Sequence, residues 1–180
     1  MAFNIEEFKS QLEFGGARAS LFQVFCNFPA EVGNNLAAKK LTFMARAAAL
    51  PESEIGVISM PYFGRTVKFA GDRTFNSWGI TIINDEDFEV RDALEEWHNL
   101  LNDRELNTRD PNFVTPNRSY KQDVEVIQYG QAGDELRKYT LIGAFPINIS
   151  SIALDWATTN RVEEFNVVFG YDYWNVDRLG

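Results

Sequence analysis

The stretch NDED, residues 84–87, places three acidic side chains directly after an alternating apolar segment. Asp85 and Glu89 would share one face of a helix, as a pair of carboxylates for glycoside cleavage could. Acidic residues are equally expected at the positively polarised start of a helix, and Asn84 or Asp85 suits an N-cap. We therefore interpret NDED as a helix start and not as a catalytic pair.

The stretch AGDRTF, residues 70–75, has the glycine and polar side chains of a ligand loop. A phosphate-binding loop needs the spacing Gly-x-x-x-x-Gly-Lys and a helix after it, whereas a strand is predicted to follow here. A tight turn between two strands accounts for the same residues, with Asp72 and Arg73 pairing with each other or with a neighbour. We predict this turn.

Other residues that could do chemistry are isolated in the sequence. His98 is the only histidine and Cys26 the only cysteine, so neither a zinc cluster nor a disulfide framework is available. No spacing typical of a catalytic triad is present. The aromatic residues of 165–173 could stack on bases or sugars, although core packing explains their alternation. We expect a protein that is not an enzyme and has no cofactor or metal.

Composition narrows the classes of partner. The 180 residues carry a net charge of −9, which argues against tight nucleic-acid binding, since that binding depends on Lys and Arg at phosphates. No secretory signal is evident, and no apolar run reaches the roughly 18 residues of a membrane span. We expect a soluble chain without membrane anchoring.

Hydrophobic periodicity predicts a mainly β protein with helices at 3–14 and 86–101. Residues 78–83 alternate with period two, and Val90, Leu94, Trp97 and Leu101 form one helix face. The expected strands are residues 20–28, 41–50, 62–70, 78–83, 123–129, 136–145, a segment between 147 and 156, and 164–174. Because strands mostly follow strands, we predict an antiparallel β-sandwich or barrel with one packed helix.

Two segments are expected to lie outside this core as arms of one domain, residues 1–180. Residues 102–121 form a long polar loop. Residues 50–61 contain prolines and glycine around apolar side chains, so no stable regular element is expected there. An apolar loop usually docks on another surface. The docking candidates are Leu50, Pro51, Ile55, Val57, Ile58, Met60 and Pro61.

The order of several motifs resembles the tail tube proteins of contractile-tailed, T4-like bacteriophages. AGDRTF…W.ITI.NDE, residues 70–86, resembles the central signature of that family. The other matching segments are LFQV (21–24), A-x-A-L-P (47–51), G-x-F-P-x-N-I-x-x-I-x-L-D-W (143–156) and F-x-V-x-F-x-Y-D-Y-W (165–174). The resemblance covers most of the chain and is weaker at 29–40, 102–121 and 175–180.

This resemblance implies a structural virion protein. Six subunits would close into a ring, and rings would stack into a tube through which DNA passes without tight binding. The implied partners are further copies of the chain, the tail sheath, the baseplate and the tail terminator. Assembly is implied in the host bacterial cytoplasm, and the final location in the phage tail. The loop at 50–61 would dock on the next ring.

The resemblance also marks framework and assembly residues. They are Asp72, Arg73, Phe75, Trp78, Asn84, Asp85, Asp155, Trp156, Asp172, Tyr173 and Trp174. For a DNA channel we expect a net negative lumen, since basic walls would hold the phosphates. The alternatives are the inner tube of a type VI-like secretion or other contractile injection system, a β-sandwich carbohydrate-active enzyme, and a single-strand nucleic-acid binder.

Overall fold

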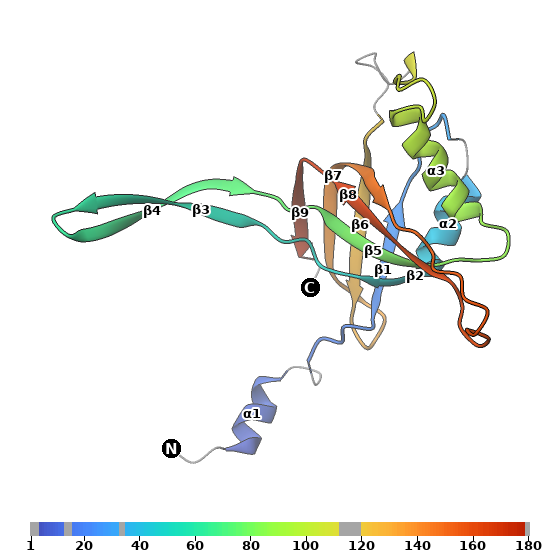
Figure 1. Cartoon of the computed structure of the whole chain (residues 1–180). Coiled ribbons are helices and arrows are strands. Elements are labelled where there is room, and N and C mark those ends of the chain that lie inside the picture. Colours follow the sequence, from blue (N-terminus) through green and yellow to red (C-terminus); the bar gives the residue numbers. More distant parts are fainter. Residues whose placement is uncertain (1–3, 13–15, 33–34, 112–119, 179–180) are drawn as a thin grey trace.

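The computed structural model describes residues 4–12, 16–32, 35–111 and 120–178. Its strands form a curved seven-stranded sheet and a separate two-stranded ribbon that projects far from the body (Figure 1). The ribbon consists of β3 (Glu54–Tyr62) and β4 (Arg65–Thr74). The sheet contains β1 (Phe22–Cys26), β2 (Ala45–Ala48), β5 (Trp78–Ile83), β6 (Gln122–Tyr129), β7 (Glu135–Ile149), β8 (Glu164–Gly170) and β9 (Tyr173–Arg178).

All strand pairs are antiparallel, as predicted, and the sheet order is β1-β6-β7-β8-β5-β2, with β9 also on β7. The long strand β7 joins two halves of the sheet. Its residues 137–142 pair with β9 and its residues 145–149 pair with β8. Between them Gly143 has a φ of 67°, and a Cβ there would lie 2.6 Å from an oxygen of Asp172. Glycine therefore permits the bend.

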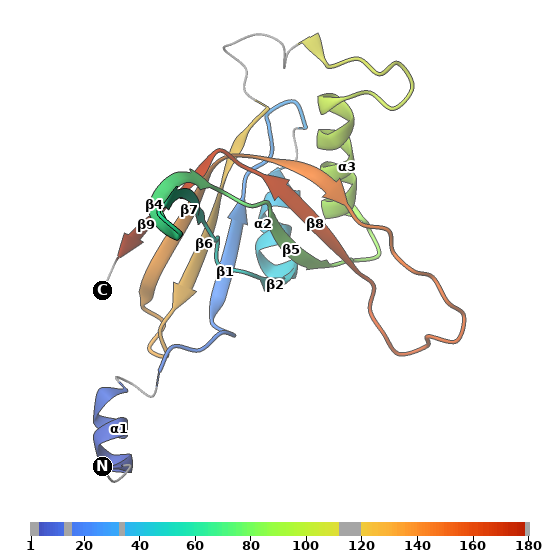
Figure 2. The same cartoon turned by 60° about the vertical axis from the view of Figure 1, so that its left-hand side comes forward.

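Alternating residues of the two halves meet in one core. The predicted inward face of β5, Trp78, Ile80 and Ile82, is buried. The helix α3 (Glu89–Leu101) buries Val90, Leu94 and Trp97 as predicted, although it begins at Glu89 and not at 86. Figure 2 shows α2 (Asn35–Met44) and α3 at one side of the sheet, while α1 (Ile5–Gln11) stands apart from the body.

The strand predicted at 41–50 is wrong over most of its length. Residues 35–44 form α2, and only Ala45–Ala48 continue as a strand. The alternation of Leu41 with Phe43 suggested a strand, but Phe43 is 78% exposed. In the helix Ala37 and Leu41, four residues apart, are both buried. Local helix propensity, from alanine, lysine and leucine, therefore outweighed the short alternation.

The C-terminal strands also differ from the prediction. No separate strand lies between 147 and 156, because β7 runs to Ile149 and residues 150–163, all described, form an irregular loop. The strand predicted over 164–174 is instead two strands, β8 and β9, interrupted at Tyr171 and Asp172. The interruption lies opposite the bend at Gly143, since the Asp172 amide donates to the Ile142 carbonyl at 3.0 Å.

We predict that Leu94→Ala destabilises the fold by about 3 kcal/mol, because the fully buried side chain leaves a cavity that neighbours fill only in part. Chemical denaturation monitored by tryptophan fluorescence measures the change. Leu106→Ala, at an exposed position in the loop after α3, is the matched control and should change stability little. Equal effects of the two substitutions would contradict this core assignment.

Candidate assembly surfaces

The segment predicted as an irregular docking loop is a β-ribbon, which we call the arm (residues 54–74). β3 pairs with β4 along its length, so the prediction of no regular element was wrong. Ile55, Val57, Ile58, Met60 and Pro61 lie on β3 and are exposed. Of the other two docking candidates, Leu50 is exposed and Pro51 is buried, and both precede the arm.

The arm has two unlike faces because side chains alternate along each strand. Ile58 pairs with Phe69 and Met60 pairs with Val67, which places four apolar side chains on one face. Ser59 pairs with Lys68 on the opposite face. All four apolar side chains are exposed. That opposite face is mixed, because it also carries Val57, Pro61 and Ala70, so the arm is an amphipathic ribbon with one mainly apolar face that is uncovered.

The predicted turn at Gly71-Asp72 is instead part of β4, where the pairing register shifts between Ile55 and Val57. A Cβ at Gly71 would lie 3.0 Å from the carbonyl oxygen of Gly56 on β3. Glycine thus allows the two backbones to approach at this bulge. Asp72 and Arg73 are on the arm, and in the part of the chain that the structure describes neither forms an ion pair.

Side-chain hydrogen bonds hold the root of the arm. The Trp78 indole donates to the Ala49 carbonyl at 2.6 Å, and the Trp174 indole donates to the Glu52 carbonyl at 3.2 Å. The Tyr171 hydroxyl donates to the same Glu52 oxygen at 3.5 Å. From the other connection, the Asn76 amide donates to the Glu52 carboxylate at 2.9 Å. We call these four donors, Trp78, Trp174, Tyr171 and Asn76, the root clamp.

Ring contacts reinforce the root clamp. The ring centroid of Phe75, which follows β4, lies 6.2 Å from that of Tyr171. The ring centroid of Trp174 lies 5.8 Å from that of Tyr139 of β7. Asp172 accepts from Lys121 at 2.6 Å, while Tyr173 is exposed. The structure thus brings three of the framework candidates, Phe75, Trp78 and Trp174, to one place, the junction of arm and body.

Two other framework candidates lie far from this junction. Asp155 and Trp156 are in the loop of residues 150–163, which projects from the body in Figure 2. The Asp155 carboxylate accepts from the Ala157 amide at 2.9 Å and so shapes a local turn. Trp156 and Leu154 are exposed there. This loop is a second apolar surface, separate from the arm.

The acidic stretch NDED forms an ion-pair site. Lys40 of α2 contacts both Asp85, at 2.7 Å, and Asp87. The hydrogen bond from Lys40 lowers the pKa of Asp85 and likewise that of Asp87. The predicted N-cap is wrong, because Phe88 holds that position with a φ of 54° and no side-chain cap. Asp87 instead accepts from the Glu89 amide at 3.2 Å.

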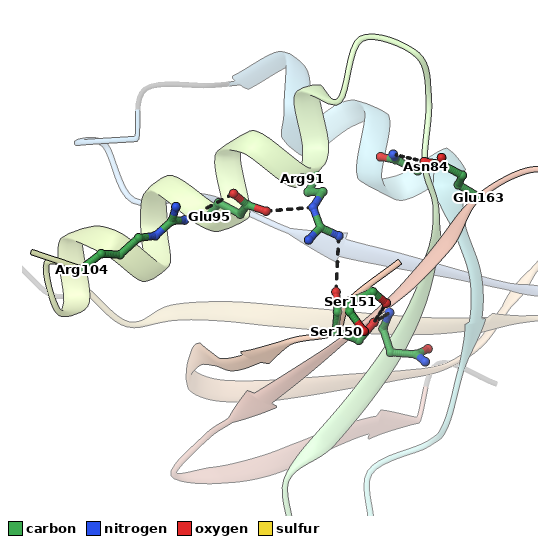
Figure 3. A network of polar contacts seen from close by, with 8 residues as sticks. Asn84, Arg91, Glu95, Arg104, Ser150, Ser151 and Glu163 are labelled. Atoms are coloured by element: carbon green, nitrogen blue, oxygen red, sulfur yellow. Dashed lines mark hydrogen bonds and ion pairs between the residues drawn. The ribbon is translucent and has the colours of Figure 1, made fainter. Parts of the chain in front are cut away.

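A polar network ties α3 to the end of the sheet, as Figure 3 shows. Arg91 donates to Glu95 at 2.8 Å and to the Ser150 carbonyl at 3.4 Å. The framework candidate Asn84 is buried and donates to Glu163 at 3.0 Å. Arg91 thus ties α3 to the residue after β7, and Asn84 joins the ends of β5 and β8 through Glu163. Lys40 ties α2 to the acidic stretch between β5 and α3, so the contacts of that stretch are structural.

Candidate chemistry outside this stretch is sparse. His98 is exposed on α3, and burial raises the pKa of the Cys26 thiol to about 12. Among the described residues no group of three metal-ligating side chains comes together, and no helix is long and apolar enough to cross a membrane. The exposed apolar side chains of the arm make it the candidate assembly surface among the described residues.

Comparison with known proteins identifies the family. The sequence model of the phage tail tube protein family matches residues 17–177. This chain belongs to that family. The tail tube protein gp19 of Enterobacteria phage T4 is 31% identical over 161 residues, which cover 88% of this chain and 90% of gp19. The tail tube protein of Serratia phage KSP90 is 28% identical over 170 residues, covering 93% of each chain.

Solved structures show the same fold. A chain of the anti-feeding prophage baseplate superposes with a TM-score of 0.64 and 14% identity, covering 91% of this tail tube family member and 97% of that chain. A chain of the PVC sheath–tube complex of an extracellular contractile injection system gives 0.56 and 16% identity, covering 99% and 100%. The predicted tail-tube-like β fold is confirmed.

Sequence reasoning missed part of the arm and of its root in this tail tube family member. Val67 and Phe69 complete the apolar face, Phe63 lies at the arm's tip, and Tyr171 and Asn76 belong to the root clamp. One signal was available. Two alternating runs flank Phe63-Gly64, and an X-Gly pair between such runs is typical of a two-residue hairpin.

We predict that the root clamp orients the arm. In the double variant Tyr171→Phe/Trp174→Phe, both donors to the Glu52 carbonyl are lost while aromatic rings remain. Spin labels at Ser59→Cys and Glu96→Cys would report the arm–body distance, and the buried Cys26 thiol should not compete for label. We expect the width of the distance distribution to roughly double.

Tyr173→Phe is the matched control for the clamp, because among the described residues its hydroxyl donates no hydrogen bond. The control should keep the narrow distribution. A narrow distribution in the double variant as well would show that backbone and ring contacts suffice to hold the arm, and would contradict the role of the two donors.

A second prediction concerns pH and Lys40. Because the folded-state pKa values of Asp85 and Asp87 are lowered, their contribution to stability is present above the unfolded pKa and is lost as pH falls below about 4. We expect Lys40→Met to lower the melting temperature at pH 7 and to have little effect at pH 2.5. Lys39→Met, an exposed neighbour, should have little effect at either pH. An equal difference in melting temperature between the parent and Lys40→Met at both pH values would contradict this prediction.

Proposed function

We propose that this chain is the structural subunit of a phage tail tube, in which six-membered rings stack into a channel that conducts DNA. Membership of the phage tail tube protein family over residues 17–177 carries the proposal. The arm supports it physically, because an uncovered amphipathic ribbon needs a partner surface. No catalytic step is part of this function.

The arm is the element that we assign to contact between subunits. An isolated two-stranded ribbon is at best marginally stable in water, and the apolar side chains of its one face are exposed. Docking on another copy would cover that face and pair an open strand edge. A contact between unlike surfaces of identical chains repeats head to tail and builds rings or filaments. A tube uses both kinds of repeat.

The charge of the chain suits a channel for DNA. Its net charge of −9 disfavours retention of a polyanion that must move along the tube. We retain the expectation of a net negative lumen, which a potential map of the assembled ring would test. The proposed partners beyond the chain itself are the sheath, the baseplate and the terminator. Assembly would take place in the host cytoplasm, before the tube becomes part of the virion.

A second candidate is the inner tube of an injection system that carries protein cargo instead of DNA. The fold similarity to a chain of the extracellular contractile injection system favours it. Gene neighbourhood separates the two functions, since capsid and portal genes accompany a phage tail, whereas effector and ATPase genes accompany an injection system. The assembly chemistry of the arm is the same in either case.

Electron microscopy of the purified chain tests tube formation directly. We expect hollow tubes or six-fold rings for the parent, alone or nucleated on isolated baseplates. Ile58→Asp places a charge on the apolar face of the arm and should abolish assembly. Ser59→Asp places the same charge on the opposite face and should be tolerated much better. Absence of rings and tubes from the parent under all these conditions would overturn the proposed function.

A further inference from the structure

The tip of the arm is a two-residue turn with an uncommon residue in it. Phe63 and Gly64 connect β3 to β4, with φ values of 41° and 80°. Positive φ at both positions is the geometry of a type I′ turn, whose twist matches the flanking strands. Gly64 adopts it freely, but Phe63 does so against the preference of a side chain with a Cβ.

Hairpin stability alone would select another residue at position 63. Asparagine followed by glycine is the favoured pair in such a turn, because asparagine tolerates positive φ. Phe63 instead combines a disfavoured backbone with a side chain that is 91% exposed. Within the described chain its ring contacts that of Tyr62, at 4.7 Å. Both the backbone and the exposure are unfavourable for the isolated subunit, so the benefit must come from outside it.

We propose that Phe63 is the anchor by which the arm binds a second copy of this chain. Its ring inserts into an apolar recess of that copy while Ile58, Met60, Val67 and Phe69 lie along the adjoining surface. The inference rests on the proposed tube function and names the side chain that fixes the end of the arm. Buried aromatic anchors of this kind dominate binding energy at protein interfaces.

A second copy fits the arm better than a membrane does. The exposed apolar side chains run along the ribbon from Ile55 to Phe63, and the face opposite Ile58 mixes Val57, Pro61 and Ala70 with Ser59 and Lys68. Apolar side chains spread along an extended ribbon match a long protein surface. A membrane-inserting tip would instead concentrate its apolar side chains at the end of the ribbon, where this arm carries Arg65.

The same chain offers a recess of suitable chemistry. A groove of about 500 Å³ lies between β1 and α2 and is lined mainly by apolar surface, including Phe25 and Phe43. Both phenylalanines are exposed in the isolated subunit. The chain therefore carries an unpaired aromatic anchor at the tip of its arm and an open apolar groove on its body, as a head-to-tail contact requires.

The test uses Phe63→Asn, because this substitution should stabilise the turn of the isolated chain and at the same time weaken assembly. In the unassembled chain, asparagine relieves the turn, and we expect amide exchange in β3 and β4 to slow by several-fold. In assembly, the lost anchor should raise the critical concentration for tube formation at least about tenfold. Phe63→Trp keeps a large aromatic ring and should assemble at close to the parent concentration.

A photo-reactive benzoylphenylalanine at position 63 identifies what the tip touches. Irradiation of tubes should yield an adduct between two copies of the chain. Assembly of Phe63→Asn at the parent concentration, or tubes that form without an adduct between copies, would overturn the anchor while leaving the tube function intact. Failure of the parent itself to assemble would overturn both, so the two failures are distinguishable.

Discussion

A two-stranded ribbon in water has unsatisfied surfaces, and this constraint organises the rest of the molecule. Its two outer edges present unpaired backbone groups, and the apolar face formed by Ile58, Met60, Val67 and Phe69 is uncovered. The body of the chain cannot cover that face, because the arm points away from it (Figure 1). A partner that supplies both an apolar surface and a strand edge would cover the apolar face and pair the open backbone groups.

The body can be understood as the support that gives the arm a direction. Five connecting residues, 49–53, separate β2 of the body from β3 of the arm. A connection of this length would swing freely without further contacts, yet two indoles and one hydroxyl donate to its carbonyls. Two of these donors, Tyr171 and Trp174, flank the bend where β8 passes into β9. The bend at Gly143 thereby places the donors at the root of the arm.

Hydrophobic patterns that continue over six or more residues predicted the body well. The alternation of Trp78, Ile80 and Ile82 and the helical face of Leu94 and Trp97 were confirmed, because burial against a core imposes a strict period. The prediction for residues 35–44 failed because a short alternation at Leu41 competed with helix propensity, and only tertiary packing decides between the two.

The β-ribbon of the arm was not predicted, for a different physical reason. Proline and glycine in residues 50–61 normally break regular structure, but Pro61 lies on a ribbon outside the main sheet, where a missing backbone donor is tolerated. Gly56 and Gly71 permit a bulge and do not end the pairing. Two of the root-clamp contacts join residues about 120 positions apart in sequence, Glu52 with Tyr171 and with Trp174. Only the folded chain brings them together.

Charge and apolar surface have opposing effects in assembly. A chain with a net charge of −9 repels its own copies, so association must come from apolar contact and from local charge reversal. The outer part of the arm, residues 58–70, supplies both, since it carries Arg65 and Lys68 and no acidic residue. In the proposed tube, an arm that is basic at its tip would be attracted to the acidic body of a neighbour. Salt at about 0.1 M would screen the repulsion between charges that lie more than roughly 10 Å apart. In the proposed tube, acidity would then keep a polyanion moving through the channel without preventing the subunits from joining.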